Sequence, residues 1–236
     1  MSTSPVFDPA VEARHRRVDA DAWSDIYAIG DVHGCRRELE SLLARIDPGP
    51  DDLVVFVGDL VRKGPDGAGV VDIVRSRSNF LAVRGNNEEK LLRGEAASGG
   101  LTPDDLDWLA SLPVVVSWEG TLVVHAGVDP RKPLRSQTVD DLQTVRSLHP
   151  DGGYRPPFWF DEYVGPRRVI FGHTPLDAPL RRPHAIGLDT GCVYGGALTA
   201  YDCRRDRTLT LDSDRTVQER DPDDFVTPAN LPAVSE

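Results

Sequence analysis

The chain has 236 residues, of which 39% are hydrophobic and 28% charged, a composition typical of a folded domain and not of a disordered chain. Its net charge of −11 argues against bulk binding to nucleic acid or to an anionic membrane, but it leaves room for one small anionic substrate. No apolar run approaches the roughly 18 residues of a membrane span, and the N-terminus lacks a signal-peptide pattern. The three cysteines argue against a disulfide framework, so we expect a cytoplasmic protein.

The first half of the chain alternates predicted strands and helices. Residues 1–22 are polar and lack apolar periodicity, so we expect a flexible leader there. The hydrophobic pattern then predicts a strand, a helix, a strand, a helix and a strand, in that order, at 26–29, 39–46, 53–57, about 66–76 and 80–83. This order predicts a parallel sheet with right-handed crossovers.

The second half is richer in strands. Capping patterns predict one helix from Thr102 to about Ser111 and another from Thr138 to about Leu148. Short apolar runs predict strands at 114–116, 122–124, 169–171, 185–188, 197–201 and 208–211. We therefore expect an α/β fold, a mixed two-sheet β-sandwich flanked by helices, over residues 23–212, followed by an acidic tail at 213–236.

Five predicted strands end in loops that carry polar, metal-binding side chains next to glycine. These side chains are Asp31, His33, Asp59, Asn86, His125 and His173. Because the carboxyl ends of parallel strands meet at one edge of a sheet, about 4.8 Å apart, we expect those of the first half to converge. The alternative, that each loop is an ordinary structural turn, does not explain five such loops in one chain.

The chemistry of this set points to metal ions. Carboxylate, amide and imidazole ligands without a thiolate suit two hard or borderline divalent ions. We expect Mn, with Fe, Zn, Co and Ni as the alternatives. A carboxylate can bridge two such ions about 3.5–4 Å apart, and a water between them becomes a hydroxide nucleophile near neutral pH.

The order of these loops resembles a known family. The motifs GDVHG, GDLVRKGP, RGNNE, HAG and GHT resemble those of calcineurin-like metallophosphoesterases of the phosphoprotein-phosphatase type. The bacterial members most similar to this chain are symmetrical bis(5'-nucleosyl)-tetraphosphatases and small serine/threonine phosphatases. The resemblance covers about residues 24–212 and implies a two-metal phosphohydrolase.

The resemblance also implies roles for individual residues. Asp31, His33 and Asp59 would hold one metal, with Asp59 bridging to a second metal, whose other ligands would be Asn86, His125 and His173. Two basic residues match phosphate-contacting positions of the family: Lys63, which replaces an arginine found in many members, and Arg84. Arg146, which we expect late in the helix opened by Thr138, is a further candidate, with an exposed helix charge as the alternative.

Two residues depart from the family pattern. The position of the histidine that is held to protonate the leaving group is occupied by Asn87, and the position of the aspartate that orients this histidine is occupied by Arg62. The sequence therefore lacks both members of the pair. Either the substrate has a leaving group that needs no proton, or another group serves, or activity is weak.

We expect a dimetal phosphohydrolase that acts on nucleoside polyphosphates, with diadenosine tetraphosphate first among them. The alternatives are a serine/threonine protein phosphatase and a non-catalytic metal-binding scaffold. The substrate is accordingly a phosphorylated small molecule or a phosphoprotein, contacted by loops near 129–137 and 150–166, and the sequence gives no oligomeric state. Arg131, Lys132 and Arg135 are candidates for holding extra phosphates, and Trp159 is either a base-stacking residue or a loop anchor.

Overall fold

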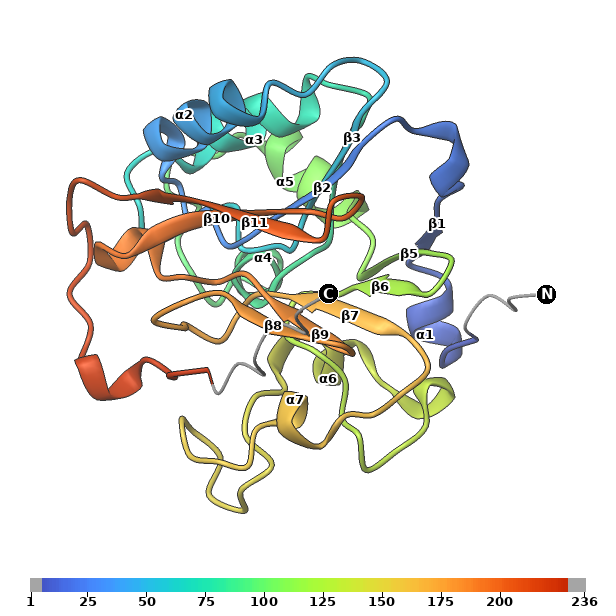
Figure 1. The fold of residues 1–236 in the computed structure, drawn as a ribbon. Helices are drawn as coiled ribbons and strands as arrows, with labels where there is room; N and C mark the ends of the chain where they lie inside the picture. The colour runs from blue at the N-terminus through green and yellow to red at the C-terminus, as the bar shows by residue number, and fades with distance from the viewer. Residues whose placement is uncertain (1–5, 229–236) are drawn as a thin grey trace.

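The computed structural model describes residues 6–228 and consists of two stacked β-sheets between two layers of helices (Figure 1). This confirms the expected α/β sandwich. None of the helices in residues 6–228 is both long enough and apolar enough to cross a membrane.

One sheet has five strands in the order β11-β10-β2-β3-β4. Its strands are β2 (Ile26–Ile29), β3 (Leu53–Phe56), β4 (Phe80–Ala82), β10 (Ala197–Asp202) and β11 (Arg207–Asp212). The first three are parallel to one another, as predicted. Strand β10 pairs antiparallel with β2, and β11 pairs antiparallel with β10. Its outer face is covered by the helices α2 (Arg36–Ile46), α3 (Gly67–Arg75), α4 (Asn86–Leu92) and α5 (Pro103–Ser111).

The other sheet has six strands in the order β1-β5-β6-β7-β9-β8 and is mixed. Its strands are β1 (His15–Arg17), β5 (Val115–Trp118), β6 (Thr121–Val123), β7 (Arg168–Phe171), β8 (Leu180–Arg182) and β9 (Ala185–Gly187). The short helices α1 (Pro9–Glu12), α6 (Val139–Thr144) and α7 (Trp159–Glu162) pack on its outer face. Single 3-10 turns complete the fold: η1 (Ala20–Ala22), η2 (Leu134–Ser136), η3 (Cys192–Tyr194) and η4 (Pro222–Asp224).

The central core lies between the two sheets. Ile26 and Ala28 point into it from β2 and meet Val123 and Ile170 of the facing sheet. The alternate residue Ile29 points outward, into the core under α2 and α3. Because both faces of β2 are buried, its sequence is a continuous apolar run instead of an alternating one.

The N-terminal segment is not a loose leader in the part that the structure describes. Strand β1 pairs in parallel with β5 at the edge of the six-stranded sheet, and Val11 of α1 is fully buried beside Phe7. The prediction was wrong because two isolated apolar residues and a three-residue polar strand carry no periodic signal. Residues 1–5 of the predicted leader lie outside the described residues.

The acidic tail also packs against the domain. Within its described part, Val226 is buried and pairs with Leu176, and Val217 N and Gln218 N donate to the carbonyl of Val193. Backbone hydrogen bonds, which the amino-acid sequence does not reveal, therefore attach this segment to the domain. Residues 229–236 of the tail lie outside the described residues.

The helix predicted from Thr138 to about Leu148 ends at Thr144 instead. The residues after it are extended because Ser147 bridges to Phe158, and Trp159 N donates to the carbonyl of Arg146. Trp159 is fully buried, and its indole N–H donates to the carbonyl of Ala126. Trp159 is therefore a loop anchor, and the base-stacking alternative is wrong.

We expect Val11→Ala to lower the free energy of unfolding by about 2 kcal/mol, because the change leaves a cavity beneath the six-stranded sheet. For a domain of this size the melting temperature would fall by about 4–8 °C in a thermal scan. Val6→Ala is the matched control, since Val6 is 68% exposed. Equal melting temperatures for the two variants would contradict the packing of the N-terminal segment against the sheet.

Candidate metal centre

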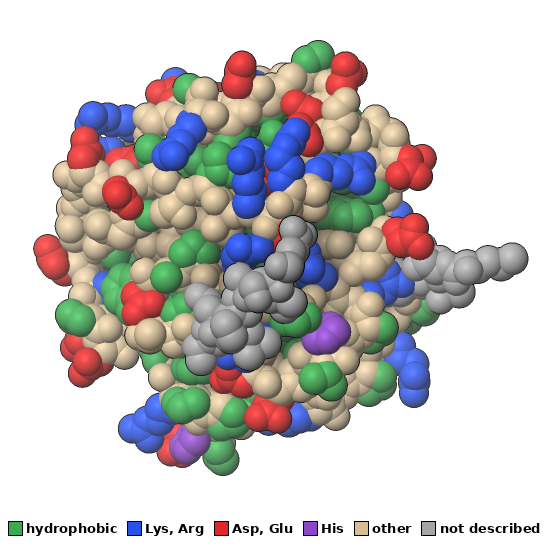
Figure 2. Space-filling view, in the orientation of Figure 1, with side chains coloured by type: hydrophobic (Ala, Val, Ile, Leu, Met, Phe, Trp, Pro, Cys, Tyr) green, Lys and Arg blue, Asp and Glu red, His purple; other side chains and the backbone are tan. Residues whose placement is uncertain are grey.

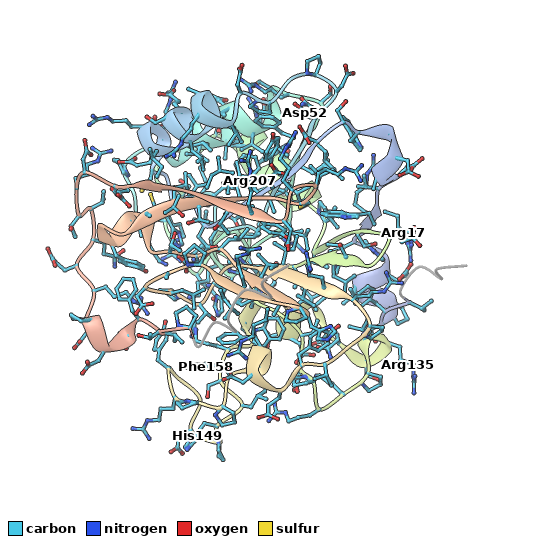
Figure 3. All side chains as sticks on the ribbon, viewed as in Figure 1. Arg17, Asp52, Arg135, His149, Phe158 and Arg207 are labelled. Carbon is cyan, nitrogen blue, oxygen red and sulfur yellow. The ribbon has the colours of Figure 1, made fainter. Side chains whose placement is uncertain are left out.

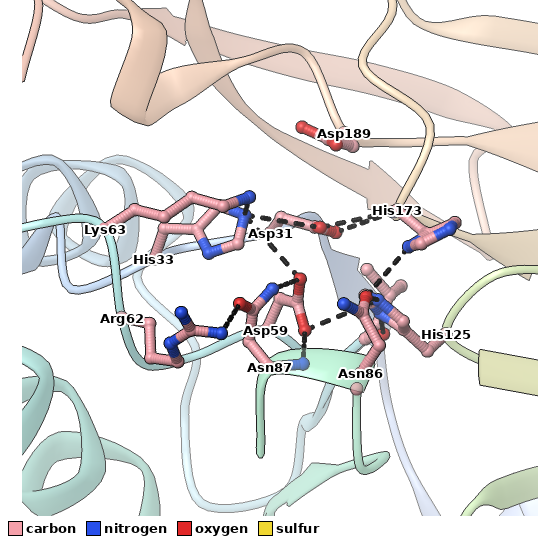
Figure 4. A network of polar contacts seen from close by, with 12 residues as sticks. Asp31, His33, Asp59, Arg62, Lys63, Asn86, Asn87, His125, His173 and Asp189 are labelled. Carbon is pink, nitrogen blue, oxygen red and sulfur yellow. Dashed lines mark hydrogen bonds and ion pairs between the residues drawn. The ribbon is translucent and has the colours of Figure 1, made fainter. Parts of the chain in front are cut away.

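Six side chains from five strand-end loops meet at the edge shared by the two sheets (Figure 4). Asp31 and His33 follow β2, Asp59 follows β3, and Asn86 opens the helix after β4. The facing sheet contributes two histidines, His125 after β6 and His173 after β7. The structure thus brings together all six residues that the sequence singled out as ligands.

Asp59 lies at the middle of the group. One carboxylate oxygen is 3.7 Å from Nε2 of His33, and the other is 3.4 Å from Nε2 of His125. Nε2 of His33 is also 3.8 Å from a carboxylate oxygen of Asp31. Ligand atoms of Asp31, Asp59 and His125 all lie within 4.8 Å of one another, a spacing at which they could hold a metal ion. Asp59 thus faces histidines on both of its sides, as a bridging carboxylate must.

Asn86 contacts both histidines of the facing sheet. Its Oδ1 lies 2.8 Å from Nε2 of His125 and 2.9 Å from Nδ1 of His173. Nδ1 of His125 is 2.9 Å from the carbonyl oxygen of Val57, a contact that orients the ring with Nε2 toward Asn86. Asn86 Oδ1 and the two imidazoles are therefore close enough to share a cation.

The electrostatics of the group also fit cation binding. Burial raises the pKa of Asp31 well above its usual value, and the carboxylates of Asp189 and Asp59 add to the effect. Burial lowers the pKa of His33 to about 3, with the Lys63 ammonium contributing, and burial also holds the pKa of His173 well below its usual range. Imidazoles bind divalent ions in their neutral form, and the positive charge of such an ion would offset the burial and repulsion that raise the pKa of Asp31. The residues present therefore fit the two-metal site that the sequence predicts.

Strained backbone is concentrated in the same loops. Of the seven non-glycine residues with positive φ in residues 6–228, five belong to them: His33, Asp59, Arg62, Lys63 and His173. Such conformations cost free energy and cluster where function requires a particular placement of side chains. Glycine is required beside them: a Cβ on Gly172 would lie 1.8 Å from a carboxylate oxygen of Asp31, and one on Gly85 would lie 2.3 Å from Asp59.

Sequence reasoning missed two acidic residues of the centre. The buried carboxylate of Glu88 accepts from the backbone N–H groups of Asp59, Val61 and Gly85, and so positions the Asp59 loop. Its place three residues after the helix start, where a side chain reaches back to the first N–H groups, was the available signal. Asp189 is buried beyond the end of β9 and faces the group (Figure 4). It follows a strand as the six ligands do.

Two of the three predicted phosphate-binding residues lie at the centre. Nζ of Lys63 is 2.8 Å from Nε2 of His33, and Nη2 of Arg146 is 2.9 Å from Nε2 of His173. Arg146 reaches His173 because it lies in an extended segment and not, as we expected, in a helix. Arg84 does not join them. Its buried guanidinium is 3.1 Å from Glu89 and donates to the carbonyl of Ala110, which makes it part of the packing of α4 against α5.

Asn87 and Arg62 contact each other beside Asp59. Nη1 of Arg62 donates to Oδ1 of Asn87 over 2.8 Å, which directs Nδ2 of Asn87 toward the Asp59 carboxylate (Figure 4). The backbone N–H of Asn87 donates to Asp59 over 2.9 Å. Asn87 thus holds Asp59 in place, and neither Asn87 nor Arg62 carries a proton that it could give to a departing alkoxide.

The basic residues of the 129–137 loop do not face the centre. Arg131 pairs with Asp129 and Lys132 with Asp141, while Arg135 projects from the edge of the molecule (Figure 3). They are therefore not the group that holds extra phosphates. His149 also lies at the periphery (Figure 3).

Comparison with known proteins identifies the fold and the centre. The family model of the calcineurin-like phosphoesterases matches residues 24–207. A Janthinobacterium protein named symmetrical bis(5'-nucleosyl)-tetraphosphatase is 31% identical over 77% of this chain and 93% of its own length. Serine/threonine-protein phosphatase 1 of Salmonella typhimurium is 31% identical over 80% and 96%, and an asymmetrical bis(5'-nucleosyl)-tetraphosphatase of Geobacillus thermodenitrificans is 31% identical over 78% and 93%.

Solved structures agree with this assignment. A crystal structure assigned as a diadenosine tetraphosphatase superposes with a TM-score of 0.76 at 31% identity, covering 85% of this chain and 98% of the other. A Saccharomyces cerevisiae serine/threonine phosphatase shares the fold alone, with a TM-score of 0.60 at 16% identity over 89% and 85%. Together with the buried ligand group, these matches identify a metal-dependent hydrolase of phosphoesters or phosphoanhydrides, and the chain belongs to the calcineurin-like phosphoesterase family.

Proposed function

We propose that this hydrolase cleaves phosphoanhydride bonds of nucleoside polyphosphates, with diadenosine tetraphosphate as a preferred substrate. The observation that carries the proposal is the contact between Arg62 and Asn87 beside Asp59. A nucleoside diphosphate leaves as a stable anion and needs no proton, whereas a serine alkoxide does. A site with an asparagine at the position of the general acid, and with a guanidinium beside it, suits the first kind of leaving group.

Two divalent ions would be held by the six ligands. We assign Asp31, His33 and Asp59 to one ion, and Asp59 as the bridge to the other. The remaining ligands of the second ion are Asn86, His125 and His173. We propose Mn as the metal, since this set of oxygen and imidazole ligands without a thiolate suits hard or borderline divalent ions. Such ions supply a nucleophile at neutral pH and neutralise charge on the phosphoryl group.

The chain's own residues position the substrate and the ligands. Lys63 and Arg146 present positive charge on two sides of the group, where they would bind the oxygens of the transferred phosphoryl. A lysine offers a point charge where an arginine would offer a fork, so Lys63 constrains the phosphoryl orientation less. Glu88 accepts from the backbone N–H of Asp59, and the backbone N–H of Asn87 donates to the Asp59 carboxylate, so these two residues fix the position of Asp59.

A serine/threonine protein phosphatase is the second candidate, since one relative of similar identity bears that name. The presence of all six ligands in one group, four of them buried, argues against the scaffold alternative. The three cysteines Cys35, Cys192 and Cys203 are free, which fits the cytoplasm that we propose as the compartment.

We expect diadenosine tetraphosphate to be cleaved to two ADP molecules in the presence of Mn, as resolved by ion-exchange chromatography. Asp59→Asn should reduce the rate to background, because it removes the shared carboxylate charge. Asp107→Asn, the same change at an exposed site, is the matched control. Products AMP and ATP would contradict the symmetrical mode, and near-native turnover by Asp59→Asn would contradict the bridging assignment.

The leaving-group argument gives a separate prediction. General-acid help is typically worth 10²–10⁴-fold, so the wild type should have a kcat/KM for nucleotide anhydrides at least about tenfold above that for phosphoserine peptides. Asn87→His alone should recover little, because Arg62 would repel a protonated imidazole. Combined with Arg62→Asp, it should raise the phosphoserine rate selectively. Equal wild-type values for both substrate classes would show that another acid serves.

A further inference from the structure

A chain of cations and aromatic rings leads away from the metal centre on the His173 side. Arg146 donates to Nε2 and to the backbone carbonyl of His173, at 2.9 and 3.0 Å. Its guanidinium lies 4.4 Å from the ring centre of Tyr154. The guanidinium of Arg220, in the C-terminal segment, also contacts Tyr154 and lies 4.8 Å from the centre of its ring.

The chain returns to the metal centre on the His33 side. Arg220 also lies 4.9 Å from the ring centre of Tyr194, which follows β9 in turn η3. Nζ of Lys63 lies 5.3 Å from the same ring and 2.8 Å from Nε2 of His33. Together with the ligand group at the metal centre, the contacts close a ring. We call its five members outside the ligand group the cation–tyrosine ring: Arg146, Tyr154, Arg220, Tyr194 and Lys63. The first and last of them, Arg146 and Lys63, contact the candidate metal ligands His173 and His33.

The ring is built by ordered backbone. The segment that carries Arg220 is attached before it, where Val217 N and Gln218 N donate to Val193 O, and after it, where Val226 N donates to Pro175 O. The side chain of Phe225 lies 5.7 Å from the Arg220 guanidinium and meets Tyr194 edge-on. Arg220 is therefore placed from both sides, between the turn after β9 and the loop after β7.

None of the three cations of this ring forms a direct ion pair with a carboxylate in residues 6–228, and the Nε atoms of both arginines are buried without a hydrogen-bond partner. Buried carboxylates of the metal centre act on Lys63 and Arg146 only from beyond ion-pair distance. Arg220 donates to the backbone carbonyl of Asp224 over 3.3 Å. Basic side chains elsewhere behave differently. Arg205 and Arg207, for example, pair with Asp202, and Figure 2 shows acidic side chains interspersed among the basic ones on that face of the molecule. In a protein of net charge −11, three cations around one site without a direct ion-pair partner favour an anionic ligand.

We propose that Arg220, held between Tyr154 and Tyr194, forms a second anion subsite that receives the phosphates beyond the one at the metal ligands. Lys63 and Arg146 contact the metal ligands and serve the reacting phosphoryl, whereas Arg220 is a ring member away from them and serves the rest of the chain of phosphates. Arg220 is thus a specificity-determining residue for polyphosphates. The inference rests on the proposed function and extends it to a residue of the C-terminal segment.

The test compares a substrate with four phosphates and a substrate with one. In Arg220→Gln, the ratio of kcat/KM for diadenosine tetraphosphate to kcat/KM for p-nitrophenyl phosphate should fall about tenfold, because the variant loses one charged contact to the longer substrate. We expect most of this change in the KM for diadenosine tetraphosphate. Arg220→Lys should recover most of the ratio, because it keeps the charge. Arg37→Gln is the matched control: Arg37 is exposed on α2 and pairs with Asp214 of the same C-terminal segment.

Inhibition of p-nitrophenyl phosphate hydrolysis gives a readout that does not need the dinucleotide as a substrate. Tripolyphosphate should inhibit the wild type more strongly than inorganic phosphate, and Arg220→Gln should weaken tripolyphosphate about tenfold relative to phosphate. Parallel changes for both inhibitors, or none, would overturn the subsite. A wild type that hydrolyses p-nitrophenyl phosphate but not diadenosine tetraphosphate would instead overturn the proposed substrate, and the inhibitor series would still decide the role of Arg220.

Discussion

The carboxylate of Asp59 is buried between the two sheets, where other buried carboxylates and imidazoles surround it. It accepts from Asn87 and lies between His33 and His125, while Asp31 and Asp189 add further buried carboxylates nearby. Burying several carboxylates together is costly unless positive charge is supplied. Divalent cations supply it, and the surrounding architecture can be understood as the means of keeping these ligands together.

That architecture depends on both sheets. The parallel strands β2, β3 and β4 deliver Asp31, His33, Asp59 and Asn86, and the facing sheet delivers His125 and His173. The apolar layer between the sheets fixes their separation, and thus the distance across which the two histidines meet Asn86. Left-handed backbone at His33, Asp59 and His173 then turns each side chain inward, at a cost that the packed strands can sustain.

The ligands could be predicted from the sequence because each is local to a strand end. A buried apolar run followed by glycine and a polar residue identifies both the strand and the loop, and parallel order places the loops together. The position of Arg146 could not be predicted in this way. Its segment is extended because Ser147 bridges to Phe158, a contact between residues that are distant in sequence. Arg84, by contrast, follows a strand end as the ligands do, yet Glu89 draws its guanidinium into the packing of α4 and α5.

The positions of Arg220, Val11 and Val226 could not be predicted from the sequence for the same reason, since contacts between residues distant in sequence determine them.

The most direct test of the account is anomalous diffraction from crystals grown with Mn. We expect two Mn peaks per chain, both within bonding distance of the Asp59 carboxylate, with Asn86, His125 and His173 around one and Asp31 and His33 around the other. A single peak in fully loaded crystals, or a second peak that Asp59 does not touch, would contradict the bridging carboxylate on which the account depends.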